Sequence, residues 1–136
     1  MNPQQLAQQF IDALHALEQG SEEQVEALVA LFATDARLTN AALQLAGREE
    51  KGADGARHFW TQYRRTLGRA YSRFSHVTTD EKSAGLFWTT EGQTQDGVDI
   101  SYDGVSLLEF GDDGKITFFR GYYDTRDLTI ETSAIG

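Results

Sequence analysis

Apolar residues follow helical spacing in three segments of the first half of the chain. In residues 3–19 and again in residues 53–67, apolar side chains recur every three to four positions, which is typical of amphipathic helices. Residues 21–32 show the same spacing and begin with Ser21, a residue type that caps helix N-termini. We therefore expect three helices. Their apolar stripes are Leu6, Phe10, Leu14 and Leu17; Val25, Leu28, Val29, Leu31 and Phe32; and Ala56, Phe59, Trp60, Tyr63 and Leu67.

The second half of the chain changes to the alternation of β-strands. Turn-forming segments rich in Asp and Gly separate four such stretches, which is the chemistry of consecutive antiparallel hairpins. A further short strand is expected at residues 36–40. This order predicts an α+β fold in which three N-terminal helices pack on one face of a curved, mostly antiparallel sheet. The four strands are expected at residues 69–79, 84–95, 98–110 and 115–125.

Length and composition favour a single domain spanning residues 1–136. The hydrophobic fraction of 40% and the charged fraction of 24% are ordinary for a globular protein. The net charge of −9 repels phosphate backbones and anionic lipid surfaces, so we expect neither nucleic acid nor a membrane as partner. The chain has no basic start followed by a long apolar run, and we expect it to be cytoplasmic.

The residue types argue against metal and cofactor chemistry. Cysteine is absent, and the three histidines, His15, His58 and His76, fall on separate predicted elements without the spacing of metal ligands. No nucleophile elbow and no phosphate-binding glycine loop occur. We expect no metal and no cofactor. His58 is interpreted as a surface residue, with a place at a pocket mouth as the alternative.

The last predicted strand carries the strongest candidate site. Alternation places Ile116, Phe118, Arg120, Tyr122 and Asp124 on one side of it and Phe119 and Tyr123 on the other. Because both sides are mostly apolar, we expect the first to line a cavity under the helices and the second to contact another subunit. The prediction is a homodimer formed through the convex face of the sheet. That contact would use Phe119, Tyr123 and Trp88.

Three stretches, in this order and spacing, resemble one known family. They are Phe32-Ala-Thr-Asp-Ala-Arg-Leu38, Gly47-Arg-Glu with the helix to Phe59-Trp60, and Asp113-Gly-Lys-Ile through Arg120-Gly-Tyr-Tyr-Asp124. Together they are similar to the SnoaL-like branch of the nuclear transport factor 2-like superfamily. The resemblance implies a cone-shaped fold whose interior binds a small hydrophobic or polycyclic ligand. The superfamily includes ketosteroid isomerases, polyketide cyclases, limonene epoxide hydrolases, scytalone dehydratases and proteins without catalysis, so fold alone does not settle function.

Limonene epoxide hydrolase allows a comparison residue by residue. Its strand-end acid falls on Asp124 and its water-holding asparagine on Asn40, whereas its tyrosine, arginine and second acid are replaced by Leu38, Glu91 and Gln93. The replacement of arginine by Glu91 would set two carboxylates face to face, and such a pair shares a proton.

The resemblance thus implies a cofactor-independent acid–base enzyme of the isomerase, cyclase or hydrolase type. Asp124 and Glu91 are its expected catalytic pair. The alternative is a non-catalytic ligand-binding or dimerisation domain. The residues expected to contact the ligand are Asn40, Gln93, Leu38, Trp60, Phe118 and Tyr122.

Overall fold

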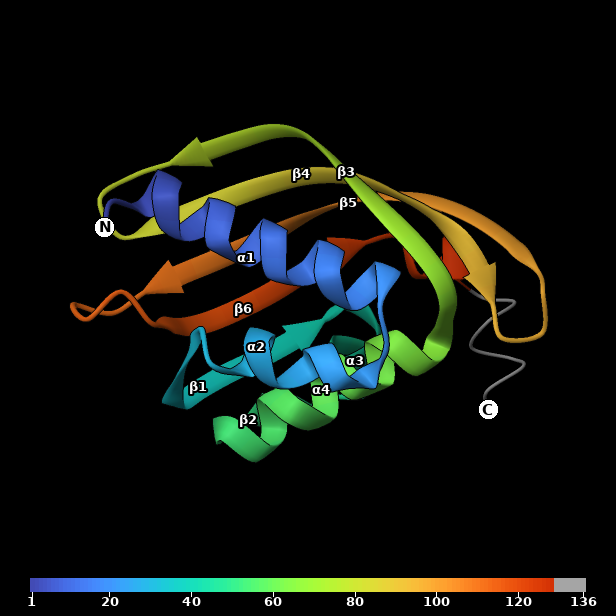
Figure 1. The fold of residues 1–136 in the computed structure, drawn as a ribbon, viewed down its shortest axis with the longest axis horizontal. Coiled ribbons are helices and arrows are strands. Elements are labelled where there is room, and N and C mark those ends of the chain that lie inside the picture. The colour runs from blue at the N-terminus through green and yellow to red at the C-terminus, as the bar shows by residue number, and fades with distance from the viewer. Residues whose placement is uncertain (129–136) are drawn as a thin grey trace.

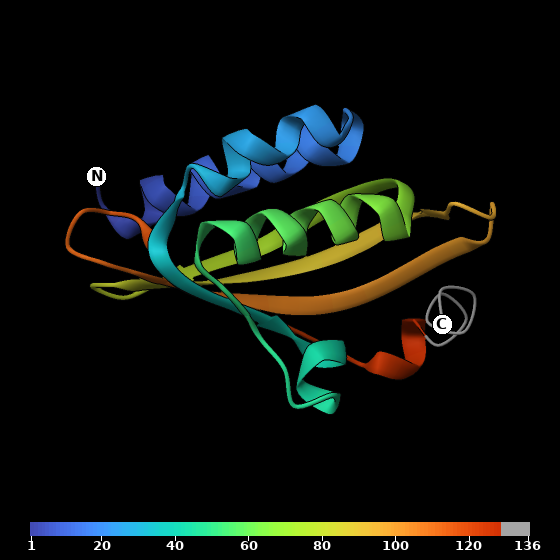
Figure 2. The same cartoon turned by 90° about the horizontal axis from the view of Figure 1, so that it is seen from below.

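Helices cover one face of a curved, six-stranded sheet in the computed structural model, which describes residues 1–128 (Figure 1). Seen from below, helices α1 and α4 lie over the sheet and α2 lies beside them on the same side (Figure 2). The helical elements are α1 (Pro3–Gln19), η1 (Glu22–Gln24), α2 (Val25–Val29), α3 (Ala41–Leu45), α4 (Gly52–Thr66) and η2 (Thr125–Leu128). The strands are β1 (Phe32–Asn40), β2 (Glu50–Lys51), β3 (Leu67–Thr79), β4 (Ser83–Thr94), β5 (Asp99–Phe110) and β6 (Ile116–Tyr123).

The sheet has the strand order β2-β1-β6-β5-β4-β3. Strands β3 to β6 form the expected antiparallel meander, and β1 lies parallel to β6 at its far side. The predicted α+β architecture is thus confirmed. The differences lie between residues 21 and 52, where the second helix is shorter than expected and Phe32 begins a strand instead of ending a helix. The segment between the expected strand at residues 36–40 and the expected helix at residues 53–67 forms two further elements, α3 and β2.

A β-bulge in β6 reverses the faces that simple alternation predicts. Glu109 and Phe110 of β5 are neighbours, but their partners in β6 are Phe118 and Ile116, so Thr117 is an extra residue in the pairing. Both Ile116 and Phe119 therefore point to the helices and are buried. After the bulge, Phe119, Gly121 and Tyr123 face the helices, and Phe118, Arg120 and Tyr122 face outward. The face assignments of Phe118, Phe119, Tyr122 and Tyr123 made from the sequence were consequently wrong.

The two sides of strand β4 are also the reverse of those expected from the sequence. Trp88 and Thr90 face the helices, and Phe87, Glu91 and Gln93 lie on the outer face, where their side chains are exposed. The alternation of β4 was correctly predicted, but the side facing the helices was not. Trp88 therefore does not contribute to the outer face, contrary to the dimer contact that the sequence suggested.

The hydrophobic core fills the end of the fold where β6 begins. There an aromatic cluster packs α1 and α4 onto the sheet, with the rings of Trp60 and Phe119 5.1 Å apart and those of Phe10 and Trp60 5.7 Å apart. Toward the C-terminal end of β6, Tyr123 lines the cavity, and its ring lies 5.7 Å from that of Tyr102. The fold is thus filled at one end and hollow at the other.

Candidate functional site

A cavity of about 570 Å³ lies between the sheet and the helices α1 and α4. A volume of this size is typical of sites for small organic molecules, which are mostly apolar with a few convergent polar groups. Side chains from both layers contribute, because the curved sheet diverges from α4 along its length. The main apolar and aromatic lining residues are Phe10, Leu14, Phe59, Trp60, Trp88 and Phe119.

Polar side chains gather at two places on the cavity wall, and the deeper one surrounds Glu18. This carboxylate is 3% exposed. It accepts hydrogen bonds from the Tyr63 hydroxyl at 2.5 Å, the Ser72 hydroxyl at 2.6 Å and the Ser72 backbone N–H at 2.9 Å. The Ser72 and Thr90 hydroxyl oxygens are 2.7 Å apart. Tyr63, Ser72 and Thr90 all line the cavity, and Glu18 lies behind them. We call these four residues the Glu18 network.

Helix α1 places Glu18 in the core because the residue belongs to its apolar stripe. The buried positions of the helix include Leu14 and Leu17, which are four residues and one residue before Glu18. A buried carboxylate requires hydrogen-bond donors, and β3 and α4 supply them. Burial, followed by the negative charge of Glu18, raises the pKa of Tyr63 well above its ordinary value. Tyr63 therefore stays a neutral phenol whose hydroxyl donates a hydrogen bond to Glu18.

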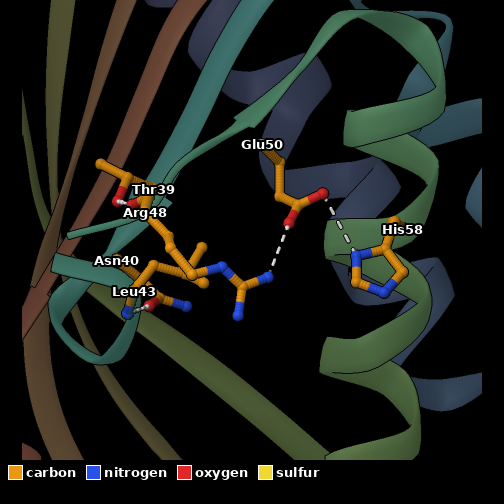
Figure 3. Close-up of polar contacts among 6 residues, drawn as sticks. All are labelled: Thr39, Asn40, Leu43, Arg48, Glu50 and His58. Carbon is orange, nitrogen blue, oxygen red and sulfur yellow. Dashed lines mark hydrogen bonds and ion pairs between the residues drawn. The ribbon is translucent and has the colours of Figure 1, made fainter. Parts of the chain in front are cut away.

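The second polar group lies at the cavity mouth and consists of Glu50, His58 and Arg48. The Glu50 carboxylate lies between the other two side chains (Figure 3). His58 Nδ1 is 3.2 Å from Glu50 Oε2, and one Arg48 guanidinium nitrogen is 3.7 Å from Glu50 Oε1. The Glu50 side chain is 16% exposed, against 56% for His58. A mostly buried acid thus orients a more exposed imidazole at the entrance, and we call these three residues the mouth cluster.

Local hydrogen bonds fix the backbone that carries the mouth cluster. The Thr39 hydroxyl donates to the Arg48 carbonyl oxygen at 3.1 Å, which ties the segment after α3 to β1. The Asn40 side chain accepts from the Leu43 backbone N–H at 2.8 Å and caps α3 (Figure 3). The sequence predicted a ligand contact for Asn40, and this side chain also lines the cavity.

Of the six residues predicted to bind ligand, two line the cavity and four lie elsewhere. Asn40 and Trp60 line the cavity. Leu38 is fully buried in the core, and Gln93 is an exposed residue that donates to Asp99 at 2.9 Å. Phe118 and Tyr122 are on the outer face because of the bulge in β6, where Arg37 lies over the Phe118 ring.

The expected catalytic carboxylates, Asp124 and Glu91, are not brought together. Asp124 is exposed and paired with Arg126, with 2.7 Å between Oδ2 and the guanidinium. Glu91 is exposed on β4 and paired with Arg73 at 2.8 Å. Neither residue lines the cavity. Hydrogen bonds from the side chain and backbone of Arg126 lower the pKa of Asp124 to about 2. This shift is opposite to the one that a shared proton would cause.

Sequence reasoning missed most of the residues that form the two polar groups. One signal was available, because Glu18 interrupts the apolar stripe of the first helix and a charge there must find partners. Tyr63 belongs to the apolar stripe of the α4 segment, and this pattern by itself predicts a core residue. His58 lies at the pocket mouth, which was the alternative interpretation. Nothing in the local pattern marked Glu50 or Arg48.

Two other kinds of site are not found in the part of the chain that the structure covers. In residues 1–128, no three His, Asp or Glu side chains lie together in a way that could hold a metal ion. Over the same residues, every helix is too short or too polar to span a membrane.

Sequence comparison identifies one family for nearly the whole chain. The profile of the SnoaL-like domain matches residues 7–119. A search of curated protein sequences found no match.

Solved structures share the fold at low sequence identity. A proposed isomerase from Rhodopseudomonas palustris aligns with a TM-score of 0.78 and 18% identity over 95% of this chain and 96% of that one. A nuclear transport factor 2-like protein of unknown function from Burkholderia pseudomallei aligns with a TM-score of 0.78 and 16% identity over 94% of this chain and 95% of that one. SalBIII, an epoxide hydrolase/cyclase-like enzyme of pyran ring formation in the polyether salinomycin, aligns with a TM-score of 0.75 and 14% identity over 92% of each chain. At these identities the likeness shows the nuclear transport factor 2-like fold alone.

Proposed function

The chain belongs to the family of SnoaL-like domains, and on this premise we propose that its cavity binds a small, mainly apolar molecule. The observation that carries the proposal is the cavity itself, about 570 Å³ in volume and lined mostly by aromatic and aliphatic side chains. Such a lining removes apolar ligand surface from water, which is the main source of affinity for a molecule of this class. Asn40 and Trp60 are among the residues that would contact the ligand.

The mouth cluster supports a proton-transfer step in this cavity. When His58 Nδ1–H donates to the Glu50 carboxylate, Nε2 keeps a free lone pair and can accept a proton. Glu50 then stabilises the imidazolium that forms, and Arg48 holds the position of Glu50. We assign His58 the role of general base and Glu50 that of its positioning residue, in a cofactor-independent reaction. Asp124 and Glu91 have no part in this proposal because neither reaches the cavity.

The names of two structural neighbours agree with this class of reaction. One is a proposed isomerase and the other an epoxide hydrolase/cyclase-like enzyme. Both kinds of activity can proceed by moving protons without a cofactor. Isomerase, cyclase and hydrolase chemistry is therefore the range in which we place this protein.

A chromogenic proton-abstraction probe tests the role of His58. We expect the protein to accelerate ring opening of 5-nitrobenzisoxazole, which requires only the removal of one carbon-bound proton. His58→Gln should lower the rate by about 100-fold, since a positioned general base contributes roughly 10²- to 10⁴-fold. Glu50→Gln should have a smaller effect. Asp124→Asn is the matched control and should leave the rate unchanged. Equal rates for the wild type and His58→Gln would remove His58 from the proposal.

The outer face of the sheet supports a second proposal, a homodimer. Phe87, Val105 and Tyr122 are cross-strand neighbours on β4, β5 and β6, and Phe87 and Tyr122 are 39% and 43% exposed. The guanidinium carbon of Arg120 lies 4.4 Å from the centre of the Tyr122 ring and adds a polar group beside this row. Contiguous apolar side chains on an exposed sheet face are typical of a contact surface. The contact differs from the one expected from the sequence, because Phe119, Tyr123 and Trp88 face the cavity.

Light scattering tests the homodimer. We expect the wild type to have twice the 15.1 kDa mass of the chain at micromolar concentration. Phe87→Glu should shift the mass to that of a monomer, because a dimer would bury two added negative charges near its two-fold axis. Gln4→Glu adds the same charge to an exposed position of α1 and should leave the dimer intact. A wild type that is monomeric at this concentration would refute the proposal.

A further inference from the structure

The Glu18 network has a defined direction of hydrogen bonding. The Tyr63 and Ser72 hydroxyls both donate to the Glu18 carboxylate. A serine hydroxyl carries a single proton, and that of Ser72 is used on Glu18. The proton between Ser72 and Thr90, whose oxygens are 2.7 Å apart, must therefore come from Thr90. All three hydroxyl protons are thus directed away from the cavity and toward Glu18.

The cavity wall at this point consequently offers only acceptors. Tyr63 and Thr90 line the cavity. Each hydroxyl already donates its one proton within the network, but its oxygen still has lone pairs that can accept a hydrogen bond. A ligand group that only accepts hydrogen bonds finds no partner here, and the loss of its water partners would not be compensated. A group that donates finds two oxygens whose own bonds run to a carboxylate, which strengthens their acceptor character.

Among the described residues, no cation balances the charge behind the wall. Within residues 1–128, no Lys, Arg or His forms an ion pair with Glu18, and the hydrogen bonds to its carboxylate come from neutral groups. Aromatic rings stand on the same side of the sheet, with Trp88 and Tyr102 5.3 Å apart at the cavity wall. Ring faces attract cations, and an apolar surround weakens the screening of the Glu18 charge.

We infer that the cavity is selective for an apolar molecule carrying a hydrogen-bond donor, above all a protonated amine, seated against the Tyr63 and Thr90 hydroxyls. This inference rests on the proposed binding of a small molecule in the same cavity. It adds the chemical class of the ligand. Amines rank first, since they donate and carry a positive charge, and alcohols second, since they donate but carry no charge. Ketones rank last because their oxygen can only accept.

Four probes with one carbon skeleton test the inference and the proposed function separately. Tetralin has no polar group, and 2-aminotetralin, 2-tetralol and 2-tetralone present a cation, a donor and an acceptor. Trp60 and Trp88 both line the cavity and are the two tryptophans of the chain, so their fluorescence reports binding. We expect 2-aminotetralin to bind at least about tenfold more tightly than 2-tetralone, because hydrogen bonds to charged groups are roughly twice as strong as neutral ones.

Variants then assign the preference to the network. Glu18→Gln keeps the shape but removes the charge and adds an N–H donor, which frees hydroxyl protons to turn toward the cavity. The ratio of amine to ketone affinity should fall to about one. Thr90→Val removes one wall acceptor and should lower the ratio even if Glu18→Gln folds poorly. Glu23→Gln is the matched control, because it makes the same chemical change at an exposed residue that does not line the cavity, and should leave the ratio unchanged.

The outcomes separate the two proposals. Binding of tetralin with equal affinities for the amine and the ketone would overturn the donor preference and leave the cavity-binding proposal standing. A preference for the amine that survives unchanged in both Glu18→Gln and Thr90→Val would overturn the role of the network. Failure of all four probes to bind would remove the proposed function and this inference with it.

Discussion

Replacing Gly121 with leucine should abolish ligand binding without unfolding the protein. Gly121 lies on β6, is buried and lines the cavity. A Cβ atom added there meets only Asn40 Cβ at 3.7 Å and a Phe119 ring carbon at 3.9 Å, which is ordinary van der Waals contact. The larger side chain therefore extends into the cavity. We expect the affinity for tetralin-type probes to fall by about 100-fold or more, which corresponds to about 3 kcal/mol.

Fluorescence titration of Trp60 and Trp88 measures this loss. Gly121→Ala is the graded control, since one methyl group at the wall should leave most of the binding intact. Thermal unfolding should show that Gly121→Leu is at least as stable as the wild type, because glycine weakens a strand interior and a leucine fills empty space. Wild-type affinity in a folded Gly121→Leu protein would place the ligand outside this cavity.

Replacing Glu18 with alanine should give the largest loss of stability among single changes to the polar groups. The substitution removes the acceptor of three hydrogen bonds, and the buried Ser72 N–H is left without a partner. Removing a buried charge is favourable by itself, but orphaned donors and an unfilled space outweigh that gain. We expect a loss of about 3 kcal/mol in the free energy of unfolding, a large part of the 5–15 kcal/mol typical of a domain.

Urea unfolding and the melting temperature both report this loss. A change of about 3 kcal/mol should lower Tm by roughly 10 °C in a domain of this size. Glu18→Gln should cost less, because its amide oxygen can still accept from the Ser72 N–H. Glu23→Ala serves as control, since within the described residues the exposed Glu23 side chain makes no hydrogen bond or ion pair, and its stability should stay within about 0.5 kcal/mol of wild type. A comparable stability for Glu18→Ala and Glu23→Ala would show that the network contributes nothing.

The helices and strands that were predicted well share strong local signals. The segments of α1 and α4 carry long apolar stripes at helical spacing, and the last four strands are separated by turn residues. The segment between Ser21 and Gly52 was predicted less well because α2, α3 and β2 each have five residues or fewer. Five residues of α2 or α3 cannot show a period, and the two residues of β2 become a strand only by pairing with Arg37 and Leu38 of β1.

At the candidate site, the strands themselves were predicted correctly. The errors concern the side of the sheet on which their residues lie. From the sequence, Glu91 and Gln93 were expected at the ligand and Trp88 on the outer face. Alternation along a strand separates its two sides, but it does not show which side the helices cover. In β6 the extra residue Thr117 changes the side on which every later residue lies. The alignment with epoxide hydrolases could not correct these faces, because three of its five positions already differed.

The sequence by itself determined the fold class, the family and the presence of a charged residue on the apolar stripe of the first helix. These properties follow from local periodicity and from the order of motifs along the chain. Only the tertiary structure decided which carboxylates face the cavity. Glu18 meets Ser72 across 54 residues of sequence and Tyr63 across 45, and such contacts arise when α1 and α4 pack on the sheet. Asp124 stands beyond the end of β6, where Arg126 neutralises it and the cavity is out of reach.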